Sequence, residues 1–372
     1  MEIAIIGFGG MGHHTLSTLD GDPRISRIHL VDPDSKRKPA DLSTRSNLVW
    51  HDSHHALLTG ASPDFKLAFV TASNDAHKPL ALDLIRAGKA VMLEKPIATT
   101  LADSIEVVHE AVRRSAFLQI GFELRYSKLY EGVKEWIDAG LLGDVINTQC
   151  TYVCSEFHKK NSWRNKLSTG GSMFGEKLCH YVDLPRWWIG SEVTEVYTVA
   201  APNVVPYYEV RDNYHCTYKF ENGAVSHLSF VMYLAETFNG DPLQNNVTQQ
   251  RDDGHELRYL VMGTRGAVET DVFRRRLRRW QYGDSPESMT SHLVETRTWD
   301  EREDSRYFHD SSIQAKDVVD RVARGLPSFT DPRDSLRTMI LVDAAERSIV
   351  EGGPIRLSYP KLSAAFEADS KK

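Results

Sequence analysis

The chain has 372 residues, a formal net charge of −6 and 41% hydrophobic residues. This length exceeds what one hydrophobic core usually organises, so it predicts two domains. The acidic net charge argues against a general nucleic-acid-binding protein. Four scattered cysteines without a CxxC pair favour a cytoplasmic location. The start "MEIAIIGFGG" lacks the basic segment of a signal peptide, and no apolar run approaches the ~20 residues of a membrane span.

The first third of the chain alternates short apolar strands with amphipathic helical patterns. Strands are predicted at 2–6, 27–32, 67–71, 90–93 and 117–121. Strands separated by helices of this length are typical of a parallel sheet with helices on both faces. We therefore expect an α/β domain with a parallel sheet over residues 1–122.

The segment "GFGGMG" joins the first strand to the next helix and matches the GxGxxG pattern. The first glycine allows the tight turn, the second lets the backbone approach a pyrophosphate, and the third lets the helix pack on the strand. The helix N-terminus then offers free N–H groups to the phosphates. The predicted contacts are Gly7, Phe8, Gly9, Gly10, Met11 and Gly12.

Asp32 ends the second strand, about 20 residues after this motif, as the dinucleotide fingerprint requires. Its carboxylate would accept hydrogen bonds from the ribose hydroxyls and repel a 2′-phosphate, so NAD is favoured over NADP. Lys36 and Arg37 follow closely and could soften this preference, or they form a solvated basic turn.

Polar residues also follow the later strands, at the carboxyl edge where open α/β sheets bind ligands. Thr71, Ser73, Asn74 and His77 are candidate cofactor contacts, with helix capping by Asn74 or Asp75 as the alternative. In "LEKP", Glu94 and Lys95 would face the same crevice. A lysine there can donate to a substrate oxygen or carry protons.

The motifs "GFGGMG", "TASNDAH", "LEKP", "GFELRY", "GGSMFGEKLCHYVD" and "GTRGAVETD" occur in this order along nearly the whole chain. Together they resemble the glucose–fructose oxidoreductase, inositol dehydrogenase and MocA (Gfo/Idh/MocA) family. Strand-like runs follow one another in the second half of the chain without intervening helices, which predicts a mostly antiparallel sheet. The resemblance implies an N-terminal Rossmann domain, residues 1–122, and a second α/β domain, residues 123–372, with a large open sheet. It also implies a homodimer or homotetramer formed through the outer face of that sheet, and a substrate between the sheet and the nicotinamide.

The resemblance also implies the catalytic residues. Lys95 matches the lysine of the EKP motif, and His180 matches the histidine of the D-x-x-x-H segment. Glu176 stands where most members have Asp, which leaves open whether it binds substrate or only orients His180. On a helix, Glu176, His180 and Asp183 would share one face.

The second domain is predicted to contain strands at 145–153, 192–199, 214–220, 225–231, 257–262 and 267–271, with a hairpin turn at Asn222–Gly223. We expect "SPESMTSH", residues 285–292, to be a loop. A final helix should span about 334–351, and the tail after Tyr359 should be loosely ordered.

A polar, basic loop over residues 156–171 could close over a substrate. Trp163 could stack on a sugar, and Arg164 or Lys166 could bind a carboxylate, sulfonate or phosphate. Arg125 could do the same. Lys177 and Asp183 are further candidate substrate contacts. An exposed loop without ligand is the alternative interpretation.

Two other segments suggest different chemistries. "FRRRLRRW", residues 273–280, favours a solvated edge strand or a salt-bridged oligomer surface over a nucleic-acid site, because the net charge is acidic. "WHDSHH", residues 50–55, lacks any constraint on ligand geometry, so we expect no metal site.

The leading hypothesis is an NAD-dependent dehydrogenase of a sugar, cyclitol or related polyol. His180 would act as general base, while Lys95 steadies the alkoxide. The first alternative is a redox-neutral, NAD-dependent glycosidase that oxidises its substrate transiently, eliminates the aglycone and returns the hydride. The second is a cofactor-binding sensor without turnover.

Overall fold

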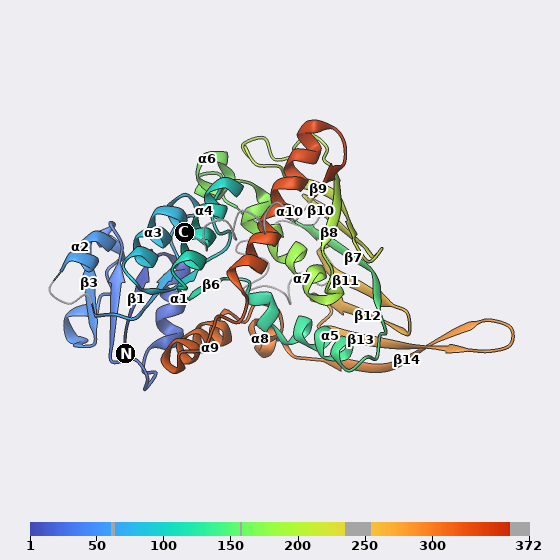
Figure 1. Ribbon diagram of the computed structural model, residues 1–372, viewed down its shortest axis with the longest axis horizontal. Helices are drawn as coiled ribbons and strands as arrows, with labels where there is room; N and C mark the ends of the chain where they lie inside the picture. The colour runs from blue at the N-terminus through green and yellow to red at the C-terminus, as the bar shows by residue number, and fades with distance from the viewer. Residues whose placement is uncertain (61–63, 157, 235–253, 358–372) are drawn as a thin grey trace.

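The computed structural model describes residues 1–60, 64–156, 158–234 and 254–357, so the predicted loose tail lies outside the described residues. Two β-sheets with their helices form two lobes, and helix α10 (Pro332–Glu351) runs between them (Figure 1). No described helix has both the length and the apolar character needed to cross a membrane.

The first lobe is built on a parallel sheet of six strands in the order β3-β2-β1-β4-β5-β6. Five strands match the prediction. The sequence prediction missed β3, a four-residue strand running into a polar, histidine-rich turn. The elements are β1 (Glu2–Ile6), α1 (Gly10–Leu19), β2 (Arg27–Val31), β3 (Leu48–His51), α2 (His54–Thr59), β4 (Leu67–Val70), α3 (Asn74–Arg86), β5 (Ala90–Leu93), α4 (Leu101–Arg113) and β6 (Leu118–Ile120).

The second lobe holds a nine-stranded sheet in the order β14-β13-β12-β11-β7-β10-β9-β8-β15. Its pairs are antiparallel except for β7 with β10, which confirms the predicted mostly antiparallel sheet. The strands are β7 (Val145–Cys154), β8 (Val193–Val199), β9 (Asn213–Phe220), β10 (Val225–Met232), β11 (Glu256–Gly263), β12 (Gly266–Asp271), β13 (Arg276–Asp284), β14 (Met289–Thr298) and β15 (Ile355–Arg356).

Side chains alternate between buried and half-buried along β10 and β11, as expected where one face of a sheet is covered. Some helices of this part of the chain pack on the sheet, and others pack against helices of the first lobe. They are α5 (Lys128–Asp138), α6 (Leu167–Gly170), α7 (Cys179–Ile189), α8 (Asp304–Phe308), α9 (Ser311–Arg324) and α10. Short helical turns precede four of them: η3 (Glu123–Tyr126), η4 (Trp163–Asn165), the π-helical η5 (Phe174–Leu178) and η7 (Glu301–Glu303).

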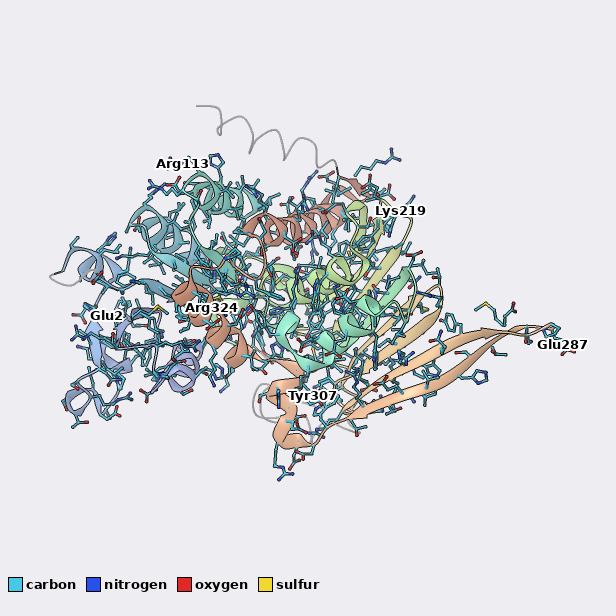
Figure 2. All side chains as sticks on the ribbon, turned by 60° about the horizontal axis from the view of Figure 1, so that its bottom comes forward. Glu2, Arg113, Lys219, Glu287, Tyr307 and Arg324 are labelled. Carbon is cyan, nitrogen blue, oxygen red and sulfur yellow. The ribbon has the colours of Figure 1, made fainter. Side chains whose placement is uncertain are left out.

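The arginine-rich segment 273–280 is not an edge strand. It supplies β13, which lies between β12 and β14, and β14 forms the edge. Its arginines pair within the chain, since Arg276 and Arg278 both donate to Glu269 at 3.0 Å. The predicted loop is also shorter than expected, because Met289 already begins β14. Figure 2 shows Glu287 at the far tip of this hairpin, well away from both lobes.

The final helix α10 begins after Asp331, whose side chain accepts the Arg333 N–H, and ends at Gly352 in the left-handed conformation. This confirms the predicted C-terminal helix. Helix α9 also belongs to the chain segment assigned to the second domain, yet it packs on α1, and its buried Ala315, Val318 and Val319 join the core of the first lobe.

Candidate active site

The glycine motif adopts the geometry that its sequence predicts. Gly7 has a φ of 92°, and a Cβ there would lie 2.5 Å from the Ala72 Cα. A Cβ on Gly12 would lie 2.4 Å from the Gly7 carbonyl oxygen. Helix α1 begins with Gly9 as N-cap, without a side-chain cap or an acidic residue in its first turn. Free N–H groups therefore face an open approach beside Gly10, which fits the pyrophosphate of a dinucleotide.

Asp32 lies beside this turn and is buried. Its carboxylate accepts the Phe8 N–H at 2.8 Å and the Asp34 N–H at 2.9 Å. Arg37 donates to the same carboxylate at 3.2 Å. The carboxylate is thus fixed next to the glycine turn, where a ribose would lie, and Arg37 is held beside it.

The polar side chains after β4 mostly form hydrogen bonds to backbone carbonyls of neighbouring segments. The Thr71 hydroxyl donates to the Gly7 carbonyl at 2.6 Å, and Asn74 Nδ2 donates to the Gly170 carbonyl at 3.0 Å. Ser73, not Asn74 or Asp75, is the N-cap of α3. His77 is fully buried between the carbonyls of Pro96 and Ala72, and burial lowers its pKa to about 4. A neutral His77 therefore fastens α3 to the LEKP turn.

The carboxyl end of β5 places Lys95 against the second lobe. Its ammonium donates to the Glu176 carbonyl and lies 3.7 Å from the Glu176 carboxylate. Burial disfavours the charged amine, but the Glu176 carboxylate outweighs it, so the pKa of Lys95 is raised. Lys95 is therefore a cation at neutral pH and not a neutral base.

Glu94, the neighbour of Lys95, is mostly uncharged at neutral pH. A Cβ on Gly121 would lie 2.7 Å from its carboxylate, so only a glycine at the end of β6 leaves room for it. Burial, together with the negative charge of Glu123, raises the pKa of Glu94 to about 8. Glu94 is mostly protonated at neutral pH and can donate a hydrogen bond.

Glu176 lies in the π-helical turn that precedes α7 and is buried. His158 Nε2 is 3.1 Å and Arg164 Nε is 3.0 Å from its carboxylate. Burial opposes its charge, but Lys95, His158 and Arg164 together hold the pKa of Glu176 well below its usual range. No hydrogen bond or ion pair within the described residues joins Glu176 to His180. The option that Glu176 orients His180 therefore finds no support in this geometry.

His180 is almost fully buried at the start of α7. Its Nε2 is 3.4 Å from a carboxylate oxygen of Glu123, and its Nδ1 has no hydrogen-bond partner among the described residues. His309 Nδ1 lies 2.7 Å from the same Glu123 oxygen. Burial lowers the pKa of His180 to about 3, against the pull of Glu123, so the imidazole is neutral at physiological pH.

Arg125 and Asp183 are bound to each other. Arg125 Nε and Nη2 donate to the Asp183 carboxylate at 2.6 and 2.7 Å, and both residues are buried. Arg125 also donates to Asp334 at 2.9 Å, and Thr338 donates to Asp183 at 2.9 Å. These contacts join η3, α7 and α10, and substrate binding by Arg125 or Asp183 stays a prediction.

The remaining predicted contacts lie at the outer side of the site. The Arg164 guanidinium is 5.0 Å from the Trp163 ring centroid, and its side chain is 46% exposed. Lys177 is half-buried, on the turn that carries Glu176. The Asn74–Gly170 bond holds this loop to the first lobe, so Arg164 is placed between Glu176 and solvent.

Two parts of the sequence match family descriptions. Residues 1–122 match a family described as "Oxidoreductase family, NAD-binding Rossmann fold", and residues 130–269 match the "GFO/IDH/MocA C-terminal domain". The chain belongs to the Gfo/Idh/MocA oxidoreductase family. It is an enzyme of oxidoreductase type with an NAD-binding Rossmann domain, which confirms the resemblance seen in its motifs.

Relatives within this family cover the whole chain. Inositol 2-dehydrogenase 1 of Saccharopolyspora erythraea is 25% identical over 370 residues, which are 98% of this chain and 99% of that protein. Inositol 2-dehydrogenase of Burkholderia multivorans is 24% identical over 379 residues, 99% of both.

Solved structures of other proteins share the fold. GenD2 from gentamicin A biosynthesis, in complex with NAD, has a TM-score of 0.75 at 22% identity and covers 96% of both chains. Levoglucosan dehydrogenase with NADH and levoglucosan has a TM-score of 0.75 at 18% identity and covers 96% of this chain and 99% of that one. At these identities the likeness shows the two-lobed architecture alone.

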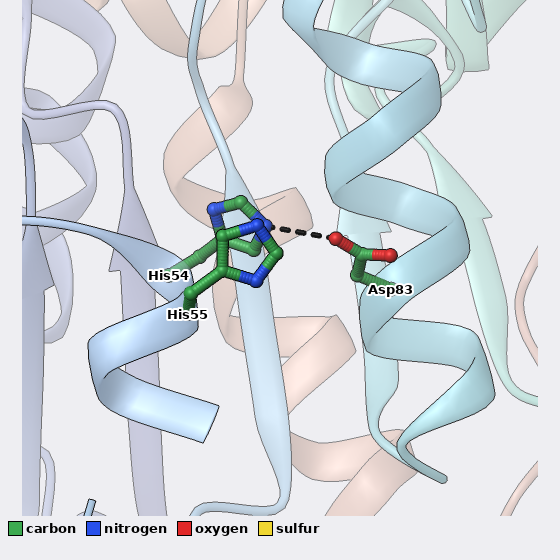
Figure 3. Close-up of side chains that lie close together, drawn as sticks. All are labelled: His54, His55 and Asp83. Atoms are coloured by element: carbon green, nitrogen blue, oxygen red, sulfur yellow. Dashed lines mark hydrogen bonds and ion pairs between the residues drawn. The ribbon is translucent and has the colours of Figure 1, made fainter. Parts of the chain in front are cut away.

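Three side chains of metal-binding type lie together elsewhere, on α2 and α3 (Figure 3). The ligand atoms of His54, His55 and Asp83 are within 4.8 Å of one another. His54 Nε2 and Asp83 Oδ2 are already joined at 2.9 Å. This bond explains the cluster as a link between the two helices, and the absence of a metal site stays a prediction.

Proposed function

We propose that this enzyme oxidises a hydroxyl group of a cyclitol, sugar or related polyol with NAD as hydride acceptor. One observation carries the proposal: Lys95, at the carboxyl edge of the first sheet, lies next to Glu176 and close enough to His180 to influence its charge. Whole-length similarity to proteins named inositol 2-dehydrogenase supports a cyclitol. The fixed Asp32 carboxylate favours NAD over NADP.

The charges of the site suit this reaction. When bound, NAD supplies the nicotinamide carbon that accepts the hydride. The Lys95 ammonium, held by Glu176, donates to the substrate oxygen and stabilises the alkoxide that forms as its proton leaves. The neutral His180 takes this proton, since an unprotonated ring nitrogen accepts. Trp163 and Arg164 contribute the wall of the sugar site on the loop side.

The test is stopped-flow formation of NADH from myo-inositol and a panel of sugars, with wild type, Lys95→Met and His180→Asn. Each substitution should lower kcat by about 10²–10⁴-fold, because positioned acid–base groups contribute this much. Lys89→Met, at a lysine packed on Phe65 outside the site, is the matched control and should keep wild-type rates.

Three results would contradict the proposal. Near-native rates in both site variants would remove Lys95 and His180 from the chemistry. Release of an aglycone from glycosides without net NADH would favour the redox-neutral glycosidase. Tight NAD binding without turnover of any polyol or glycoside would favour the sensor. The predicted homodimer or homotetramer stays a prediction that sedimentation of the same samples would settle.

A further inference from the structure

Glu123 is a buried carboxylate to which the sequence pattern assigned no role. It begins the η3 turn, separated from the end of β6 by two residues, and its carboxylate oxygen Oε1 lies close to two imidazoles. His180 Nε2, from α7, lies 3.4 Å away, and His309 Nδ1, from the segment between α8 and α9, lies 2.7 Å away. Three segments that are distant in sequence thus converge on one oxygen atom.

The charge of Glu123 fixes which partner carries the hydrogen. Burial disfavours the carboxylate, but its contacts with His180 and His309 and the positive charge of Lys95 hold the pKa of Glu123 far below its usual range, so it is ionised and can only accept. A neutral imidazole has one N–H. Since His180 points its Nε2 toward an acceptor, the hydrogen belongs on Nε2 and the lone pair on Nδ1.

The surroundings of His180 hold the ring in this orientation. The Phe122 ring packs edge-on against it with centroids 6.0 Å apart, and the His309 ring does so at 5.9 Å. Nδ1 is buried and meets no hydrogen-bond partner among the described residues. A buried nitrogen with a lone pair and no partner is costly unless a ligand supplies a donor, and a substrate hydroxyl is such a donor.

The two other carboxylates near Lys95 do not offer the same contact. Glu176 is engaged by His158, Arg164 and Lys95. Glu94 is largely protonated at neutral pH. Among the described residues, Glu123 is the carboxylate that lies within ion-pair distance of His180.

We propose that Glu123 is the positioning residue of the acid–base site: it fixes His180 in the Nε2–H tautomer, so that Nδ1 accepts the substrate proton, while His309 steadies the carboxylate. The inference rests on the proposed dehydrogenase function. In the step, the substrate O–H bond breaks and an N–H bond forms at Nδ1. The carbon that bears this oxygen would give up its hydrogen as hydride to NAD, when NAD is bound, and become a carbonyl carbon. The Nε2 hydrogen stays in place. The new imidazolium charge is balanced by the charge of Glu123.

The first measurement is the His180 tautomer, read from ¹⁵N NMR of the free enzyme labelled at histidine. The His180→Asn variant assigns the signals by their loss. Wild type should show Nε2 protonated and Nδ1 bare. In Glu123→Gln the amide group can donate to Nε2, so the hydrogen should shift toward Nδ1. Glu110→Gln, at a carboxylate paired with Arg113 and Arg114 outside the site, should leave the His180 signals unchanged.

The second measurement is turnover. Glu123→Gln should lower kcat by about 10²–10³-fold with KM within about threefold, because the base nitrogen is blocked while the substrate site is intact. Glu123→Asp, which keeps the charge, should recover at least about tenfold of this loss. A His309→Asn variant, which keeps an N–H donor, should lose less than about tenfold.

A wild-type His180 that carries its hydrogen on Nδ1 overturns the inference, and so does a Glu123→Gln enzyme with kcat within threefold of wild type. The inference is also overturned if Glu123→Gln loses activity while the His180 tautomer stays unchanged, because Glu123 would then affect turnover without setting the tautomer. The NMR arm needs no substrate. If wild type turns over no polyol, the proposed function fails, and the tautomer still decides whether Glu123 positions His180.

Discussion

Replacing Arg125 by methionine tests whether the Arg125–Asp183 pair is a structural joint or a substrate contact. The substitution keeps an unbranched apolar side chain but removes two donors to Asp183 and one to Asp334. Arg125 and Asp183 side chains are 7% and 2% exposed, so the abandoned Asp183 charge cannot reach water. Breaking a buried pair in this way costs about 3–5 kcal/mol, a fall of about 10²–10⁴-fold in the folded-to-unfolded ratio.

The assay is urea unfolding followed by far-UV circular dichroism, with turnover of the folded enzyme measured in parallel. Arg347→Met is the matched control, because Arg347 makes two short contacts of 2.8 and 2.9 Å to Glu351 but is 52% exposed. It should leave the unfolding midpoint unchanged. The double variant Arg125→Met/Asp183→Leu removes both charges and should be about 1–3 kcal/mol more stable than the sum of the single changes.

The reasoning is refuted if Arg125→Met unfolds like wild type. It is equally refuted if the variant keeps its stability while KM for the polyol rises more than about tenfold, since Arg125 would then bind substrate directly.

Two further predictions concern the cofactor side and pH. Asp32→Ser should shift the NADP-to-NAD preference by at least about tenfold toward NADP, because Arg37, now 3.2 Å from Asp32, is left to pair with a 2′-phosphate; an unchanged ratio of kcat/KM values would contradict this. Burial raises the pKa of Glu94 from 4.5 to about 8, so between these pH values the folded protein keeps a proton that the unfolded chain releases. The free energy of unfolding should therefore fall as pH rises through this window. In Glu94→Gln, the free energy of unfolding measured with guanidinium should decrease less between about pH 5 and about pH 9 than it does in wild type. An equal decrease in both proteins would contradict the raised pKa of Glu94.

The sequence predicted those features that depend on neighbouring residues. The glycine turn from Gly7 to Gly12 and the acidic end of β2 at Asp32 are local patterns, and they occur where expected. The strand-end position of Lys95 is equally local. Each of these residues is placed by its own strand or turn, so tertiary contacts are not needed to locate it.

The chemistry around His180 was less predictable because tertiary contacts decide it. The spacing of Glu176 and His180 predicted one shared helical face, but Phe174–Leu178 forms a π turn, which changes the rotation between them. The longer Glu176 arm reaches His158 and Arg164 instead. Glu123 and His309 lie 57 residues before and 129 residues after His180 in the chain, a separation over which no periodicity carries information. The only local indication for Glu123 was its position: it is an acidic residue soon after the end of strand β6.

Pro185 explains how the helix that carries His180 is anchored. A proline cannot donate to the carbonyl four residues earlier, so the Tyr181 carbonyl is left open within α7. The Tyr259 hydroxyl, from β11, donates to it at 2.5 Å. The apparent defect in the helix is thus the point where the second sheet holds it.

Helix α10 has a consequence for how the whole molecule moves and melts. Its buried Leu341, Val342 and Ala345 belong to one continuous apolar cluster that includes Val91 of the first sheet and Tyr259 of the second. Separating the lobes would expose this shared core, so hinge opening carries the cost of partial unfolding. Denaturation should appear as a single cooperative transition. The segment around Trp163 and Gly170 lies outside this shared core: the Asn74–Gly170 hydrogen bond and the Arg164–Glu176 ion pair hold it, so it can move without separating the lobes.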